Sequence, residues 1–321
     1  MNVRRLTKML AWATVGVAAL AVAPYLIPPR RRPRLLQTDL ASTDDRFVTV
    51  DGFCMRYQVK GEGMPLILIH GFASSIVTWH RNFDDLARDH QVYAIDLKGW
   101  GLSDKPADAD YSPLAQARHV RAFMQAMGIE RAVLVGHSMG GTVSMHIAIE
   151  YPESALGIVL VDPAGAPRFA ALWLFSRALE VPVVRRWMRL GMGYVMPNEA
   201  LISSGMPRAY YNPANLTPAM KASLLAPFHT EGFDEAFIKF SRDMHRLRLH
   251  RTRDRVQCAA LIVWGEHDLV LPPTDGPYFL EQIRNSRLVI LPEAGHLPHD
   301  EQAASVNRLI REFCESLTVE P

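Results

Sequence analysis

The chain carries Gly136-His137-Ser138-Met139-Gly140-Gly141 directly after the apolar run Ala132–Val135 and directly before a helical pattern. In a G-x-S-x-G arrangement the serine occupies a strained strand-to-helix turn, and the glycines on either side let neighbouring backbone pass close to it. The first N–H groups of the following helix point toward that serine and favour negative charge there. We therefore predict that Ser138 is a nucleophile and that the backbone N–H of Met139 stabilises an oxyanion.

A serine nucleophile needs a histidine base and a carboxylate that orients the base. Asp268 follows the apolar run Ala260–Val263, and His296 follows the apolar run Leu288–Leu291. Both residues therefore fall at the ends of predicted strands, in the order nucleophile, acid, histidine. We predict a catalytic triad of Ser138, His296 and Asp268.

A second oxyanion donor is expected after the earlier strand Leu66–Ile69, where the chain reads His70-Gly71-Phe72. The backbone N–H of Phe72 is the candidate, Gly71 permits the turn, and His70 is expected to tie loops together through hydrogen bonds. No pair of histidines has metal-ligand spacing within a helix, so we predict no metal, and no cofactor is expected. The cysteines are few and scattered, which favours buried free thiols at Cys54, Cys258 and Cys314.

The chain beyond residue 45 alternates short apolar runs with helical stretches, which is typical of an α/β sheet. Helices are predicted over Pro113–Met127 and Glu301–Leu317. The alternation is interrupted between about Gly165 and Gln257, a stretch too long to be a plain loop, so we predict a helical subdomain there. Besides the strands already named, we predict an opening hairpin of Phe47–Val50 and Cys54–Val59 and strands at Val92–Ile95, Ala132–Val135 and Ile158–Val161.

These motifs together resemble the α/β-hydrolase superfamily. The resemblance rests on His70-Gly71-Phe72, the run Asp96–Asp104, the turn around Ser138, the segment Trp264–Asp268, and Gly295-His296. It implies an α/β-hydrolase fold with an eight-stranded, mostly parallel sheet and a helical cap inserted after strand six. The core would comprise residues 35–165 and 258–321, and the cap residues 166–257. Some members of the superfamily carry the acid after strand six, where this chain has Asp162, so Asp162 remains an alternative acid.

Ser138 argues against the haloalkane dehalogenases and epoxide hydrolases of this fold, which use aspartate at that position. The chain looks most similar to monoacylglycerol-lipase-like carboxylesterases, which implies hydrolysis of acylglycerol-like or other lipophilic esters. Carbon–carbon bond hydrolases of the meta-cleavage-product type usually show asparagine where this chain has His137, but they remain an alternative, as do cofactor-free haloperoxidases. A non-enzymatic ligand receptor is a further alternative.

The predicted cap, residues 166–257, holds 14 basic and seven acidic side chains. We predict that Trp173, Trp187 and Met188 bind substrate, by lining an apolar pocket for acyl chains. The alternative is that these apolar groups only pack the cap onto the sheet.

The composition is that of a globular protein, with 49% hydrophobic and 21% charged residues and a net charge of +2. Residues 1–34 carry seven basic side chains and no acid, so the rest of the chain is acidic and nucleic acid is not an expected partner. Residues 9–27 carry no charge and are long enough as a helix to span a bilayer. We predict a single-pass membrane anchor that contacts lipid, followed by a basic, proline-rich spacer up to residue 34. A cleaved signal peptide with export, or a peripheral helix, is the alternative.

Overall fold

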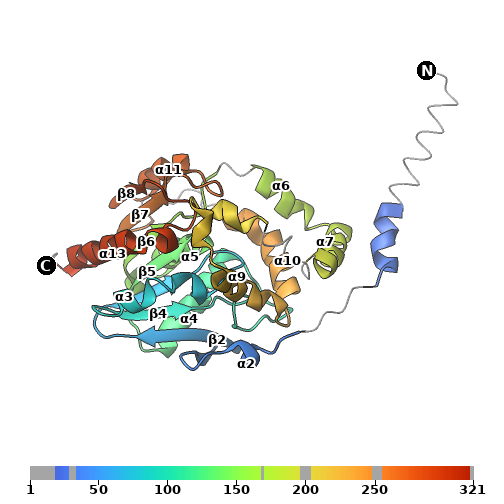
Figure 1. Cartoon of the computed structure of the whole chain (residues 1–321), viewed down its shortest axis with the longest axis horizontal. Helices are drawn as coiled ribbons and strands as arrows, with labels where there is room; N and C mark the ends of the chain where they lie inside the picture. Colours follow the sequence, from blue (N-terminus) through green and yellow to red (C-terminus); the bar gives the residue numbers. More distant parts are fainter. Residues whose placement is uncertain (1–18, 29–33, 168–169, 196–203, 248–254, 319–321) are drawn as a thin grey trace, which may run out of the picture.

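The computed structural model describes residues 19–28, 34–167, 170–195, 204–247 and 255–318 (Figure 1). An eight-stranded sheet runs through the centre in the order β1-β2-β4-β3-β5-β6-β7-β8. β1 and β2 pair antiparallel, β2 pairs antiparallel with β4, and all later neighbours are parallel. The strands are β1 (Arg46–Val50), β2 (Phe53–Lys60), β3 (Pro65–Ile69), β4 (Gln91–Ile95), β5 (Ala132–His137), β6 (Ala155–Val161), β7 (Ala259–Gly265) and β8 (Ser286–Leu291).

The central strands are apolar on both faces because each face is covered by helices. In β3, Ile67 and Ile69 belong to one core cluster while Leu66 and Leu68 belong to the other, as the alternation of side chains along a strand requires. On the first side the core includes residues of α4 (Pro113–Ala126), α5 (Met139–Glu150) and α11 (Gly276–Gln282). On the second side it includes residues of α3 (Phe83–Leu86) and α13 (Ala303–Thr318). The sheet therefore lies between two helical layers (Figure 1).

The chain between β6 and β7 forms helices and contributes no strand among its described residues. The fold predicted from the sequence is confirmed, including the helices inserted after the sixth strand. These helices are α6 (Ala170–Ala178), α7 (Pro182–Val195), α9 (Pro218–Leu225) and α10 (Phe233–Asp243), with shorter 3-10 helices at Met206–Ala209, Pro213–Asn215, Ala226–His229 and Met244–Leu247. Outside this segment the remaining short helices are α2 (Gln37–Leu40) and α12 (Pro298–Glu301), with 3-10 helices at Ile76–Trp79, Pro152–Ser154 and Pro273–Asp275.

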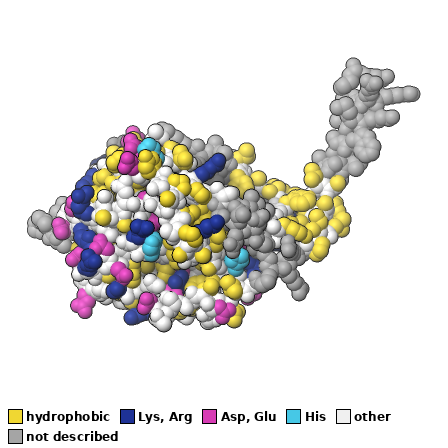
Figure 2. Space-filling model, in the orientation of Figure 1, with side chains coloured by type: hydrophobic (Ala, Val, Ile, Leu, Met, Phe, Trp, Pro, Cys, Tyr) yellow, Lys and Arg dark blue, Asp and Glu magenta, His cyan; other side chains and the backbone are white. Residues whose placement is uncertain are grey.

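Residues 19–26 form a helix that lies beside α7 (Figure 1). The guanidinium of Arg186 in α7 donates to the carbonyls of Pro24 at 2.9 Å and Ile27 at 3.2 Å. These two carbonyls belong to the C-terminal end of the short helix, where a cation is favourable. The large apolar side chains of this helix, Leu20, Val22, Tyr25 and Leu26, are exposed, and the helix forms part of the yellow surface in Figure 2.

The prediction of a membrane anchor is corrected by the structure. Among the described residues no helix is both long and apolar enough to cross a membrane. The described part of the predicted span is a helix over 19–26, which at about 1.5 Å per residue is roughly 12 Å long, against about 30 Å of hydrocarbon. Residues 9–18 of the predicted span, and residues 29–33 of the predicted spacer, lie outside the described residues. Membrane localisation and lipid contact through this helix are not supported.

All three cysteines are free, as predicted. Cys314 is buried, whereas Cys54 and Cys258 are half-buried. Burial raises the pKa of the Cys258 thiol to about 11, so this thiol is uncharged and a poor nucleophile at neutral pH.

Candidate active site

Ser138 occupies the turn between β5 and α5 with φ 50° and ψ −114°, a strained conformation for a residue with a side chain. The turn is closely packed, because a Cβ on Gly136 would overlap the carbonyl of Gly140 and a Cβ on Gly140 would overlap the carbonyl of Ile69. The backbone N–H of Ser138 donates to the carbonyl of Val161 at the end of β6, at 2.9 Å. The structure thus places Ser138 at the carboxyl edge of the sheet in the predicted strand-to-helix turn.

His296 and Asp268 are joined by a hydrogen bond of 2.7 Å between His296 Nδ1 and Asp268 Oδ2. The other oxygen of Asp268 accepts from the backbone N–H groups of Val270, at 2.7 Å, and Leu271, at 2.9 Å. Three donors therefore converge on one buried carboxylate and hold its orientation. The bond also fixes the imidazole with its Nε2 directed away from the acid, as a general base requires.

Residues 292–297 between β8 and α12 carry His296 and are called the histidine loop below. This loop is tied to the turn around Ser138 through His137, the residue before Ser138. His137 Nε2 donates to the carbonyl of His296 at 2.8 Å, and the two rings lie 4.8 Å apart. Burial, followed by neighbouring histidines, holds the pKa of His137 well below its usual range, so this ring is neutral. The sequence pattern alone did not identify the carbonyl of His296 as the partner of His137.

Glu301 is a second residue that holds the histidine loop, and sequence reasoning missed it. Its Oε1 accepts the backbone N–H of Gly295 at 2.7 Å and that of Tyr211 at 3.1 Å, and its Oε2 accepts the N–H of Asn212 at 3.1 Å. The backbone N–H of His296 also donates to a carbonyl of the inserted segment, that of Ala209, at 2.7 Å. The histidine loop is thus fastened to the chain between β6 and β7, a long-range relation that leaves no local signal.

The predicted oxyanion loop, His70-Gly71-Phe72, follows β3, and hydrogen bonds of the His70 ring hold it in place. His70 Nδ1 donates to the carbonyl of Gly71 at 2.7 Å, and Nε2 accepts the backbone N–H of Leu97 at 3.0 Å. Burial lowers the pKa of this fully buried ring, so it serves as a neutral tie between two loops, as the sequence indicated. Among the described residues, neither the N–H of Phe72 nor that of Met139 donates to a protein acceptor, which leaves both available to a substrate oxygen.

The side chain of Phe72 joins the oxyanion loop to the inserted helix α10. Its ring centroid lies 5.1 Å from each of Trp100, Phe237 and Phe240. Two of these three residues belong to α10. Aromatic contacts at such separations are favourable beyond the area that they bury. This cluster therefore fixes the position of α10 over the predicted oxyanion donors.

Asp162, the alternative acid, directly follows β6 and is fully buried close to Asp268 and His296. One side-chain atom each from Asp162, Asp268 and His296 lie within 4.8 Å of one another. Spacing alone would admit a metal ion, but His296 Nδ1 and Asp268 Oδ2 are already bonded to each other. We therefore do not assign a metal site there. The hydrogen-bond partner of the His296 imidazole is therefore Asp268 and not the alternative acid Asp162.

The three predicted substrate-binding residues lie on α6 and α7. Trp187 is 37% exposed, and its Nε1 donates to the carbonyl of Leu20 at 2.9 Å, so its polar edge faces the short helix of residues 19–26. Met188 is half-buried against the core. Trp173 lies in α6, but its side chain falls outside what the structure describes. Substrate binding by these residues stays a prediction.

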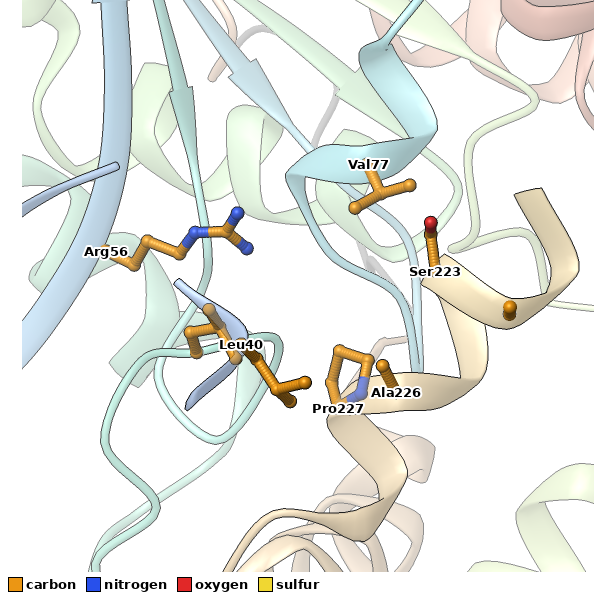
Figure 3. Close-up of a pocket in the computed structure, with 8 residues that line it drawn as sticks. Leu40, Arg56, Val77, Ser223, Ala226 and Pro227 are labelled. Carbon is orange, nitrogen blue, oxygen red and sulfur yellow. The ribbon is translucent and has the colours of Figure 1, made fainter. Parts of the chain in front are cut away.

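A pocket of about 360 Å³ lies away from these residues, between β2 and the C-terminal half of α9 with the 3-10 helix that follows it (Figure 3). The guanidinium of Arg56 points into it, facing Val77 and Leu40. Arg56 is 6% exposed and pairs with Asp45 at 2.8 Å and Asp96 at 3.1 Å, so its charge is already matched. None of the predicted catalytic residues lines this pocket.

With the fold and this geometry in place, comparison with known proteins defines the class. The family model described as alpha/beta hydrolase fold matches residues 64–303, and the chain belongs to this family.

Among its relatives, an uncharacterized protein of Mycobacterium tuberculosis is 29% identical over 306 residues, covering 88% of this chain and 84% of that protein. A 2-hydroxy-6-oxo-6-phenylhexa-2,4-dienoate hydrolase of Comamonas testosteroni is 26% identical over 273 residues, covering 81% of this chain and 91% of that protein. A solved thermophilic esterase from Thermogutta terrifontis matches with a TM-score of 0.71 at 23% identity, covering 85% of this chain and 98% of that one. This last similarity shows the fold.

Proposed function

We propose that this protein is a serine hydrolase that cleaves carboxylic esters through an acyl-enzyme intermediate. The observation that carries the proposal is the 2.7 Å hydrogen bond between His296 and Asp268, in a loop that His137 fastens to the turn holding Ser138. A buried carboxylate orienting an imidazole beside a strained serine is the arrangement that activates a hydroxyl as a nucleophile.

In the proposed reaction Ser138 Oγ attacks the ester carbonyl while His296 Nε2 takes the hydroxyl proton. Asp268 holds the imidazole and stabilises the imidazolium that forms. The N–H groups of Phe72 and Met139 stabilise the negative oxygen of the tetrahedral intermediate, and each is worth on the order of 100-fold or more in turnover. His296 then protonates the leaving alcohol and activates the water that releases the acid.

The proposed substrates are lipophilic esters such as acylglycerols. The surroundings of the predicted oxyanion loop support this assignment, because the ring of Phe72 contacts three aromatic rings. Met188 of α7 also packs on this apolar core. An acyl chain would be favoured there by about 0.8 kcal/mol for each CH₂ that leaves water.

The test is an ester panel of increasing acyl length, run on the wild type and on Ser138→Ala. Ser223→Ala is the matched control, because Ser223 is exposed and lines the remote pocket of Figure 3. We expect a fluorophosphonate probe to label the wild type and the control but not Ser138→Ala. Equal labelling of all three would refute the nucleophile, and a strict preference for acetyl esters would refute the lipophilic substrate.

Hydrolysis of a carbon–carbon bond is the second candidate function. It is supported by the similarity to the Comamonas hydrolase over 81% of this chain. The two functions use the same triad and differ in the bond that breaks, so p-nitrophenyl esters and vinylogous 1,5-diketones should be compared at equal concentration. A larger kcat/KM for the diketones would favour this second candidate.

A further inference from the structure

Asp162 is a buried acid that the proposed mechanism does not use. It directly follows β6 and is fully buried. Its φ of 43° is a left-handed conformation that is unfavourable for a residue with a side chain. Its Oδ1 accepts the backbone N–H of Gly265 at 2.9 Å. Its Oδ2 is buried and has no hydrogen-bond donor among the described residues. A buried oxygen without a donor is costly for an ionised carboxylate.

Among the described residues, the charged groups near Asp162 come from two loops and one helix, and none of them donates a hydrogen bond from a cation to it. Asp268 approaches from the loop after β7, His296 from the loop after β8, and Glu301 from α12. His296 directs its Nδ1 to Asp268, so it supplies no donor to Asp162. Of the two adjacent carboxyl groups, Asp268 receives three donors and Asp162 receives one. The negative charge therefore belongs on Asp268.

We propose that Asp162 is protonated at neutral pH and donates a hydrogen bond from Oδ2 to the carboxylate of Asp268. This proposal rests on the proposed function in one respect, namely that Asp268 is the acid of a working triad. Asp162 is then a positioning residue and does not contact the substrate. The proton on Oδ2 supplies the hydrogen bond that this buried oxygen otherwise lacks.

The titration behaviour of the pair agrees with this geometry. Burial is the first cause that raises the pKa of Asp162 well above its usual range, and the charge on Asp268 is the second. Two carboxyl groups in contact cannot both ionise, so the one with fewer donors keeps the proton.

The hydrogen bond from Asp162 has two consequences for His296. It fixes the rotation of the Asp268 carboxylate, and it withdraws negative charge from the oxygens that face the imidazole. Less charge on Asp268 stabilises the imidazolium of His296 less, and removing the hydrogen bond from Asp162 would restore that stabilisation. Among the described residues, the ring of His137 lies 4.8 Å from that of His296, and the ring of His299 packs on the ring of His137. Burial lowers the pKa of both His137 and His299, that of His299 to about 3, so neither gains a charge in the neutral range.

Three variants of the full-length protein separate the roles of the two acids. Asp162→Asn keeps both a donor toward Asp268 and an acceptor for Gly265, so the rate of fluorophosphonate labelling should stay close to that of the wild type. Asp162→Ala removes the donor and should label about 10- to 100-fold more slowly. Asp268→Asn should label on the order of 10⁴-fold more slowly. If Asp162→Asn is as slow as Asp268→Asn, then Asp162 is the ionised acid and the proposal is wrong.

The pH profile distinguishes positioning from a merely structural role. The acidic limb of the labelling rate reports His296, so it should move to higher pH in Asp162→Ala and stay in place in Asp162→Asn. An unmoved limb in Asp162→Ala, with a normal far-UV spectrum, would contradict the proposal.

A direct readout needs no substrate. Infrared spectra of the wild type at pH 7 should show the carbonyl stretch of a protonated carboxylic acid, and this band should be missing from Asp162→Asn. An identical spectrum for the two proteins would overturn the proposal whether or not any ester is hydrolysed. Conversely, the band together with inactivity on every ester would refute the proposed function and leave the proton on Asp162 established.

Discussion

Replacing Gly140 by alanine should disrupt the serine turn from inside the fold. A Cβ at this position would lie well within 3.0 Å of the carbonyl oxygen of Ile69, and 2.7 Å from that of His70. Both oxygens are backbone atoms at the end of β3, held in place by β4 and β5 on either side. Neither can rotate away as a flexible side chain would. Overpacking against such atoms costs about 1–3 kcal/mol or more of unfolding free energy, because strand and helix must separate.

Gly191→Ala is the matched control, since it makes the same chemical change inside the helix α7. A Cβ on Gly191 would meet nothing within 4 Å. Alanine is favoured over glycine in a helix interior by about 0.5–1 kcal/mol. Urea denaturation followed by circular dichroism should therefore show opposite shifts, with Gly140→Ala less stable than the wild type and Gly191→Ala slightly more stable. Fluorophosphonate labelling should fall only in Gly140→Ala. Equal midpoints for Gly140→Ala and the wild type would refute the packing argument.

Three further predictions concern ionisable side chains. Arg56→Met should lower the free energy of unfolding by about 3–5 kcal/mol, because it leaves the buried carboxylate of Asp96 without its cation; a midpoint in urea equal to that of the wild type would contradict this pairing. Asp162 has a raised pKa, so the native state keeps a proton that the unfolded chain loses. Above the ordinary aspartate pKa of about 3.9, the free energy of unfolding of the wild type relative to that of Asp162→Asn should therefore fall by about 1.4 kcal/mol per pH unit. A difference that stays constant from pH 5 to 7 would show that Asp162 holds no proton. Glu301→Ala should slow fluorophosphonate labelling, because three backbone N–H groups lose their acceptor, whereas Glu281→Ala, at an exposed position, should label at the wild-type rate.

The strands were predictable because their signal is local. Apolar runs of four residues predicted β3, β4, β5, β6, β7 and β8, and the structure extends each of them by one to three residues. The predicted helix Pro113–Met127 ends one residue earlier as α4. The predicted helix Glu301–Leu317 corresponds to α13, which begins two residues later, because Glu301 is the last residue of α12 and the non-helical Gln302 separates the two helices. The strand order required the resemblance to a family, since no local pattern states which strands are neighbours.

The prediction of a membrane-spanning helix was wrong, because an uncharged apolar run does not indicate which part of the protein it contacts. Residues 9–27 are uncharged and long enough to span a bilayer, but the described part is a short helix that binds α7 through Arg186 and Trp187. Both contacts go from a side chain of α7 to backbone carbonyls of the helix. The carbonyls of Pro24 and Ile27 lie at the C-terminal end of the helix, and any helix has unpaired carbonyls at that end, so these contacts do not make α7 predictable as the partner from residues 9–27.

The assignment of the acid shows where sequence order stops being informative. Asp162 and Asp268 both follow parallel strands of one sheet, so both reach its carboxyl edge and both could orient a histidine. Their hydrogen bonds separate them. Asp268 lies in a loop that turns two backbone N–H groups toward its carboxylate, whereas Asp162 receives a single N–H from Gly265 and has one oxygen without a donor. An acid that must stay charged beside an imidazolium needs those donors, and an acid deprived of them retains its proton. Two aspartates at equivalent strand ends thus take opposite protonation states, and the loop after β7 decides which of them faces His296.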